Sequence, residues 1–192
     1  SGLAKLLYFS GGADSVTPNC FLGCTNLKKI LMGRIGHAGT FNPGNLDSLE
    51  SFECIDCNID TMDLRRCSSL INFTFSPFNY SRISYLYLSN LKKLKNFNFS
   101  VLIGPDFSRS VIKHIDLSGC SNLLYITGDS PGFKDLSHLN VSGCSSLQNI
   151  SMLNTSLTNL DLSTCYNLQV LNFYSNEIIN LNIKNGIVSR GG

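Results

Sequence analysis

IKHIDLSGCSNLLYI (residues 112–126) is followed along the chain by LSHLNVSGCSSLQNI (136–150), LTNLDLSTCYNLQVLNF (157–173) and the partial copy IINLNIKN (178–185). Each full copy places apolar residues at its first, fourth and sixth positions, a Cys at its ninth and a Leu at its twelfth. A fixed period of this kind indicates a repeat architecture, in which each unit buries its apolar face only by stacking on its neighbours. The period therefore decides the architecture before any local propensity is considered.

The twelfth-position Leu recurs along the whole chain, at intervals of 21 to 29 residues: Leu3, Leu27, Leu49, Leu70, Leu94, Leu123, Leu147 and Leu168. A second apolar run follows in each coil from Ile59 onward. Two short strands in so few residues leave no room for a helix of ordinary length. The sequence therefore predicts a mainly β solenoid of about eight coils, with two short parallel strands per coil and little helix.

Strand alternation sends one set of side chains from each coil toward the centre of the stack. On one side of the coil these are mostly Leu and Ile. On the other side they are phenylalanines at matching positions: Phe73, Phe75, Phe97, Phe99 and Phe173. Matching positions in successive coils lie about 4.8 Å apart, the strand spacing of a sheet, so we expect a spine of stacked rings.

The chain reads as a single domain over residues 1–192. Residues 59–192 follow the period closely, whereas residues 1–58 form irregular N-terminal coils. In that region GHAGTFNPGN (36–45) is predicted to be a loop, because Gly, Pro and Asn are typical of turns. The longest interval contains IGPDFSRS (103–110), which we interpret as an insertion that bulges from the stack, and NGIVSRGG (185–192) is expected to be frayed.

Eight cysteines invite a disulfide framework, but their positions favour another interpretation. Five of them precede the register Leu by three residues: Cys24, Cys67, Cys120, Cys144 and Cys165. Stacked coils place these five in one inward column, which predicts buried free thiols. Cys54 and Cys57 are separated by only two residues. Strand alternation puts Cys54 in the core and Cys57 at the ladder position, so the two side chains are not expected to converge. We therefore expect neither a zinc site nor a redox pair.

The charge balance is weak, at +2 with 15% charged residues, which argues against nucleic acid or an anionic membrane as the partner. No apolar run approaches the roughly 20 residues needed to span a bilayer. We find no Gly-rich phosphate loop and no zinc-protease motif, and we predict no cofactor and no metal.

LTNLDLSTC (157–165) and IKHIDLSGC (112–120) match L-x-x-L-x-L-x-x-N/C, so the chain resembles the leucine-rich repeat superfamily over nearly its whole length. Cys in the Asn position and coils near 21 residues resemble the short cysteine-containing repeats of bacterial surface proteins. FLGCTNLKKI (21–30) is similar to repeats of the BspA-like group of secreted bacterial proteins. In this chain Leu follows Cys by three positions rather than two, so the subfamily and the choice of concave strand stay open.

The resemblance implies a non-enzymatic recognition module, secreted or at the cell surface, that binds a protein or glycan. The chain begins at Ser1 rather than Met, so we expect that a leader has been removed. An intracellular location stays open, because LDLSGCSNL-type text also occurs in intracellular plant and F-box leucine-rich proteins. Two other classes compete: a polysaccharide-active enzyme on a parallel β-helix, and a structural spacer within a larger surface protein.

Outward positions of the strand before the Cys hold the candidate ligand-binding residues: Tyr85, Tyr87, His114, Asp116 and His138. Aromatic rings, imidazoles and a carboxylate on consecutive coils are suitable anchors for a partner, since Tyr in particular is enriched at binding hot spots. Ser118 lies beside His114 and Asp116 and suggests a hydrolytic triad. Side chains that stand parallel on a flat sheet do not converge, however, and the sheet offers no oxyanion hole, so we predict no enzyme.

Overall fold

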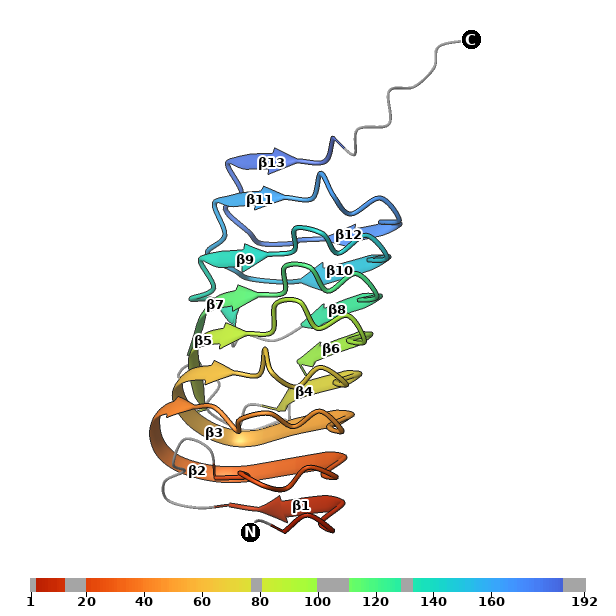
Figure 1. The fold of residues 1–192 in the computed structure, drawn as a ribbon. Coiled ribbons are helices and arrows are strands. Elements are labelled where there is room, and N and C mark those ends of the chain that lie inside the picture. The colour runs from red at the N-terminus through yellow and green to blue at the C-terminus, as the bar shows by residue number, and fades with distance from the viewer. Residues whose placement is uncertain (1–2, 13–19, 77–80, 100–110, 129–132, 185–192) are drawn as a thin grey trace.

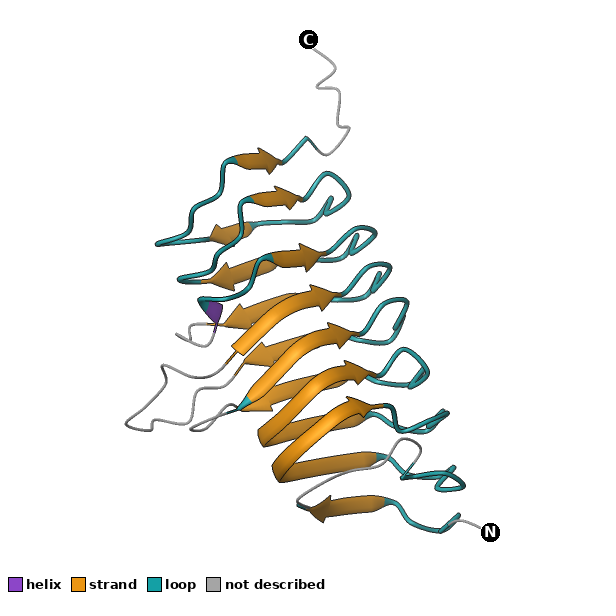
Figure 2. Cartoon of the chain, turned by 90° about the vertical axis from the view of Figure 1, so that its left-hand side faces the viewer, coloured by secondary structure: helices purple, strands orange, loops and turns teal. Residues whose placement is uncertain are grey.

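The computed structural model describes residues 3–12, 20–76, 81–99, 111–128 and 133–184. In these ranges the chain forms a parallel β-solenoid with almost no helix, as the period predicted. Figures 1 and 2 show the coils stacked in one column from the N-terminus to the C-terminus. The insertion predicted at 103–110 and the frayed end predicted at 185–192 lie outside the described residues.

Two faces of strands enclose the core. The first face carries β1 (Tyr8–Gly11), the first half of β2 (Lys29–Phe41) and of β3 (Ser51–Asp63), β4 (Asn72–Ser76), β6 (Asn96–Phe99), β8 (Tyr125–Gly128), β10 (Asn149–Met152) and β12 (Val170–Asn172). The second face, on which the strand precedes the Cys turn, carries the remaining halves of β2 and β3 with β5 (Arg82–Tyr87), β7 (Val111–Asp116), β9 (His138–Asn140), β11 (Asn159–Asp161) and β13 (Asn180–Asn182).

The solenoid makes about six turns rather than the eight coils predicted. The Leu period counts every coil that the sequence begins, but the terminal coils are incomplete. The described part of the first coil contributes only β1, and the last consists of two three-residue strands. Its inward-facing Leu171, Leu181 and Ile183 are 38%, 47% and 56% exposed, because no described coil stacks above them.

The predicted phenylalanine spine is present in the core for Phe73, Phe75, Phe97 and Phe99, whereas Phe173 is only partly buried. Phe52, Phe73 and Phe97 stack at centroid distances of 6.0 and 5.4 Å, with interplanar angles of 3° and 12°. Phe75 and Phe99 meet edge to face at 5.2 Å. All five rings are buried, and the column of Phe52, Phe73 and Phe97 continues in the next coils with Ile126 and Ile150.

The thiol column is also present. Cys24, Cys67, Cys120, Cys144 and Cys165 are buried and free. Three of these thiols donate to a carbonyl of the preceding coil: Cys120 Sγ to Leu88 O and Cys144 Sγ to Leu117 O, both at 3.2 Å, and Cys165 Sγ to Val141 O at 3.7 Å. Burial raises the pKa of the Cys67 thiol to about 12 and that of Cys120 to about 11.

Residues 36–41 form a strand, where a loop was predicted. They belong to β2, which pairs with β3 along both faces of the coil, with one irregularity between Ile35 and Ala38. The Gly-rich sequence is typical of turns, but its backbone pairs with β3, and this pairing outweighs the local turn preference. The chain bends instead at Arg34 and Asp56, which both have a φ of 53° and occupy the same corner of successive coils.

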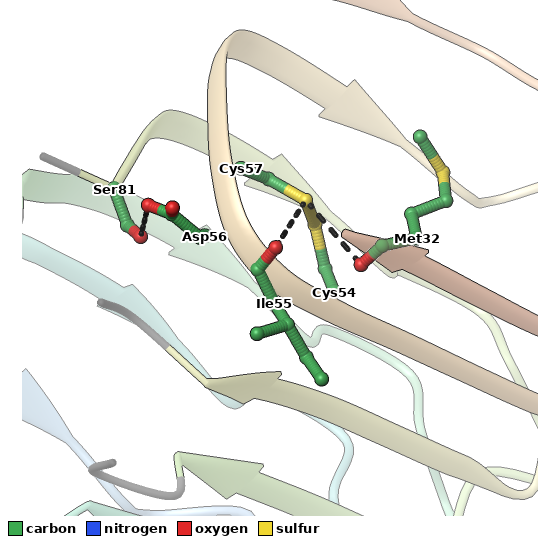
Figure 3. Close-up of a disulfide and its surroundings, with 6 residues drawn as sticks. All are labelled: Met32, Cys54, Ile55, Asp56, Cys57 and Ser81. Carbon is green, nitrogen blue, oxygen red and sulfur yellow. Dashed lines mark hydrogen bonds between the residues drawn. A yellow bond between two sulfur atoms is a disulfide. The ribbon is translucent and has the colours of Figure 1, made fainter. Parts of the chain in front are cut away.

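The corner at Asp56 also corrects the prediction for Cys54 and Cys57, which form a disulfide (Figure 3). The left-handed conformation of Asp56 shifts the strand alternation by one residue. Both cysteines therefore point inward and both are fully buried. The Cys57 Sγ lies 3.8 Å from Met32 O and 3.7 Å from Ile55 O.

Candidate functional site

The candidate site is the outward surface of β3, β5, β7 and β9 on the second face, which we call the Tyr–His face; its residues are Asp63, Arg65, Tyr85, Tyr87, His114, Asp116 and His138. Strand alternation produces it: Leu86 and Leu88, on either side of Tyr87, and Ile115 and Leu117, on either side of Asp116, are buried in the core. The ladders then align the outward residues in register, Tyr85 with His114 and His114 with His138. The five predicted residues are therefore brought together on one surface.

The aromatic rings of the face contact one another. His114 and His138 stack at a centroid distance of 5.4 Å and an interplanar angle of 19°. His114 also meets Tyr85 at 6.1 Å and Tyr87 at 5.7 Å, both in tilted arrangements. Tyr85 is 45% exposed, and the rings of Tyr87 and His114 are half-buried by their neighbours.

Arg65 is part of this surface, and the sequence analysis did not select it. Its guanidinium carbon lies 5.2 Å from the centroid of the Tyr87 ring, a cation–π contact. Its Nε and Nη2 donate to the two carboxylate oxygens of Asp63 at 2.9 and 2.8 Å. The hydrogen bond from Arg65 lowers the pKa of Asp63, and the same bond raises the pKa of Arg65. The sequence did contain a signal for Arg65: it lies two residues after Asp63, at the next outward position of the strand alternation.

Asp116 has a structural role in this geometry. Its Oδ1 accepts the backbone N–H of Ser118 at 3.0 Å, which caps the turn that follows β7. The same bond recurs at the ends of other coils, from the backbone N–H two residues after Asp63, Asn140, Asp161 and Asn182. Among the described residues, no hydrogen bond joins His114 to Asp116 or Ser118. The Asp and Asn residues at this outward position of successive coils are therefore explained by their role in capping the turn.

The pKa of His114 is lowered. Partial burial is the larger cause, repulsion from His138 adds to it, and the attraction of Asp116 opposes it. The His114 imidazole therefore favours the neutral state at neutral pH and presents hydrogen-bonding nitrogens rather than positive charge.

Within the ranges that the structure describes, no group of three His, Cys, Asp or Glu side chains is arranged to hold a metal ion. None of the helices in those same ranges is long and apolar enough to cross a membrane. Comparisons of the chain with protein-family models, curated proteins and solved structures find no match.

Proposed function

We propose that this chain is a non-enzymatic recognition module that binds a macromolecular partner, a protein or a glycan, through the Tyr–His face. The observation that carries the proposal is the packing of Tyr85, Tyr87, His114 and His138 on one partly exposed surface of consecutive strands. Tyr and Arg are the residue types most enriched at binding hot spots, and Arg65 lies over one of these rings.

The scaffold under the face is rigid, which supports the same proposal. Parallel ladders hold β3 to β5, β5 to β7 and β7 to β9 in fixed register. The inward residues of these strands are buried. Binding to such a face costs this protein little conformational entropy, because the side chains that contact the partner are already held in position.

We assign the solenoid to the leucine-rich repeat superfamily, of the short cysteine-containing bacterial type with BspA-like features. The support is the repeat text with Cys at the turn, together with a parallel solenoid of two strands per coil that is compatible with it. We also propose that the protein is secreted or at the cell surface. The disulfide between Cys54 and Cys57 supports this location, since disulfides persist mainly in oxidising compartments.

The test is a screen of protein and glycan arrays with the wild-type chain and with Tyr85→Ala/His114→Ala. The matched control is Tyr125→Ala/Tyr166→Ala, which removes two exposed tyrosines outside the Tyr–His face. We expect a partner whose affinity falls by roughly tenfold or more in the first variant, as for loss of hot-spot residues, and is unchanged in the control. A partner that is indifferent to the first variant places the binding surface elsewhere.

A further inference from the structure

The net positive charge of the chain lies around the Tyr–His face. Four coil segments in matching register form the face and the turns that follow it: residues 58–69, 82–93, 111–122 and 135–146. They hold six cations, Arg65, Arg66, Arg82, Lys92, Lys93 and Lys113, against four carboxylates, Asp60, Asp63, Asp116 and Asp135. The excess of two on these segments equals the net charge of the whole chain, +2, so the rest of the protein has no net charge.

Two of the four carboxylates of this surface are engaged in ion pairs. Asp60 pairs with Arg82 at 3.3 Å, and Asp63 pairs with Arg65 at 2.8 Å. Asp116 accepts the neutral Ser118 N–H and keeps its negative charge. The charges outside these two ion pairs are those of four cations and two carboxylates: Arg66, Lys92, Lys93 and Lys113, with Asp116 and Asp135.

Three of these cations, Arg66, Lys92 and Lys93, lie on the turns that follow β3 and β5. Lys92 Nζ donates to Gly119 O at 2.9 Å, and Lys93 Nζ donates to Ser69 Oγ at 3.2 Å. These neutral acceptors hold the two ammonium groups on the turn edge without cancelling their charge. Among the described residues, no carboxylate lies within ion-pair distance of Arg66, Lys92 or Lys93.

Two rings of the face, those of His114 and Tyr87, are covered by their neighbours. One face of His114 is covered by His138 and the tyrosines lie against the other, while Arg65 lies over Tyr87. A sugar ring stacks best on an open aromatic face, which this packing reduces. Tyrosine hydroxyls, imidazole nitrogens and flanking cations instead match the hydrogen-bond acceptors and carboxylates of a polypeptide.

We propose that the partner is a protein that presents a segment rich in Asp and Glu. Its carboxylates lie along the basic turn edge formed by Arg66, Lys92 and Lys93, and its neighbouring residues contact the Tyr–His face. Complementary charge steers the encounter and selects against basic partners. This inference rests on the proposed function, because it names the class of partner for the same surface.

The experiment pans a random dodecapeptide display library on the immobilised full chain at 50 mM NaCl and measures the selected peptides by calorimetry. Arg66→Ser/Lys92→Ser/Lys93→Ser removes three charges from the basic turn edge. Lys5→Ser/Lys29→Ser/Lys184→Ser is the matched control, because it removes three exposed lysines outside the four segments. Unfolding midpoints of both variants establish that each remains folded.

We expect selected peptides enriched in Asp and Glu, with affinity that falls roughly tenfold between 50 and 300 mM NaCl as the charges are screened. We expect a loss of roughly tenfold or more in the turn-edge variant and less than about twofold in the control, since only the first removes the complementary charges. Peptides without excess acid, equal effects of the two variants, or no peptide binder tighter than about 1 mM, some 4 kcal/mol of affinity, would each overturn the inference.

Two further arms separate this inference from the proposed function. Neutral peptides that bind wild type but not Tyr85→Ala/His114→Ala would preserve the Tyr–His face as a binding surface and overturn the acidic partner. Heparin and uronate oligosaccharides form the second arm. Binding of these glycans without acidic peptides would assign the basic edge to an acidic glycan and overturn the protein partner.

Discussion

His114 on β7 and His138 on β9 occupy paired positions of a parallel ladder, and their imidazole rings stack 5.4 Å apart. Stacked rings at this distance are easily accommodated while both are neutral. Protonation of both places two positive charges side by side on a half-buried surface, which is unfavourable. A positive charge on His138 therefore disfavours protonation of His114.

The first prediction concerns this pair. The folded-state pKa of His114 lies below its ordinary value of 6.5, so the folded protein binds that proton less readily than the unfolded chain does. The contribution of His114 to stability is present above pH 6.5 and is lost as the pH falls through the folded-state pKa. We expect the midpoint of His114, followed by NMR, to lie below 6.5 and to rise in His138→Gln, because one of its causes is removed. A midpoint unaltered by this substitution would contradict coupling between the rings.

The second prediction concerns the thiols. Cys20 is the exposed free cysteine among the described residues, whereas the five thiols of the buried column have no contact with solvent sufficient for reaction. We expect a labelling reagent to modify one thiol in the native protein and six in denaturant. Partial desolvation of the exposed Cys20 raises the pKa of its thiol, so its reaction should accelerate as the pH rises above 9. Native labelling of two or more thiols would show that the column is accessible.

The same column gives a stability test. Cys144→Ala removes the S–H group that donates to Leu117 O and leaves a small void, so we expect a loss of about 1–3 kcal/mol in the free energy of unfolding. Cys20→Ala is the control and should change it by less than about 0.5 kcal/mol, as for an exposed site. Urea unfolding of the two variants measures both values.

The repeated sequence pattern predicted the solenoid well, because the same spacing determines which residues are buried and where the turn falls in every coil. It could not predict the corners. Arg34 and Asp56 adopt a left-handed conformation without being Gly, and the phase shift at Asp56 brings Cys57 to Cys54. Strand alternation likewise selected the outward residues of the site. The contact of Arg65 with Tyr87 depends on rotamers across neighbouring coils, which the period does not specify.

The third prediction concerns the disulfide. It closes a loop of only four residues, so the loop-entropy model gives about 2 kcal/mol of stabilisation. We expect Cys54→Ala/Cys57→Ala to stay folded and to lose roughly that amount, with any added cost of the vacated core space raising it. Intact mass under non-reducing conditions should be about 2 Da below that of the reduced chain, the mass of two hydrogens lost when the bond forms. Equal masses would show two free thiols at this corner.

The last prediction concerns Gly128, the last residue of β8, and Phe133, which lies in the segment that follows β8. Gly128 occupies the column in which neighbouring coils carry Phe99 and Met152, and the Phe133 ring fills its space, 4.2 Å from the Phe99 ring. A Cβ on Gly128 would lie 2.0 Å from Phe133 Cε2, well inside contact distance. The absence of a side chain at Gly128 therefore admits the aromatic ring that completes the spine.

We expect Gly128→Ala to destabilise by about 1–3 kcal/mol through overpacking, and Phe133→Ala by about 3–5 kcal/mol through a cavity. The double variant should lose less than the two single losses added together, because the new methyl group enters the space that the ring vacates. Gly39→Ala is the control, since a Cβ there meets nothing within 4 Å. Urea unfolding of the four variants measures the coupling. Additive losses would mean that the two positions do not share one space, and the ring would then reach the spine by another route.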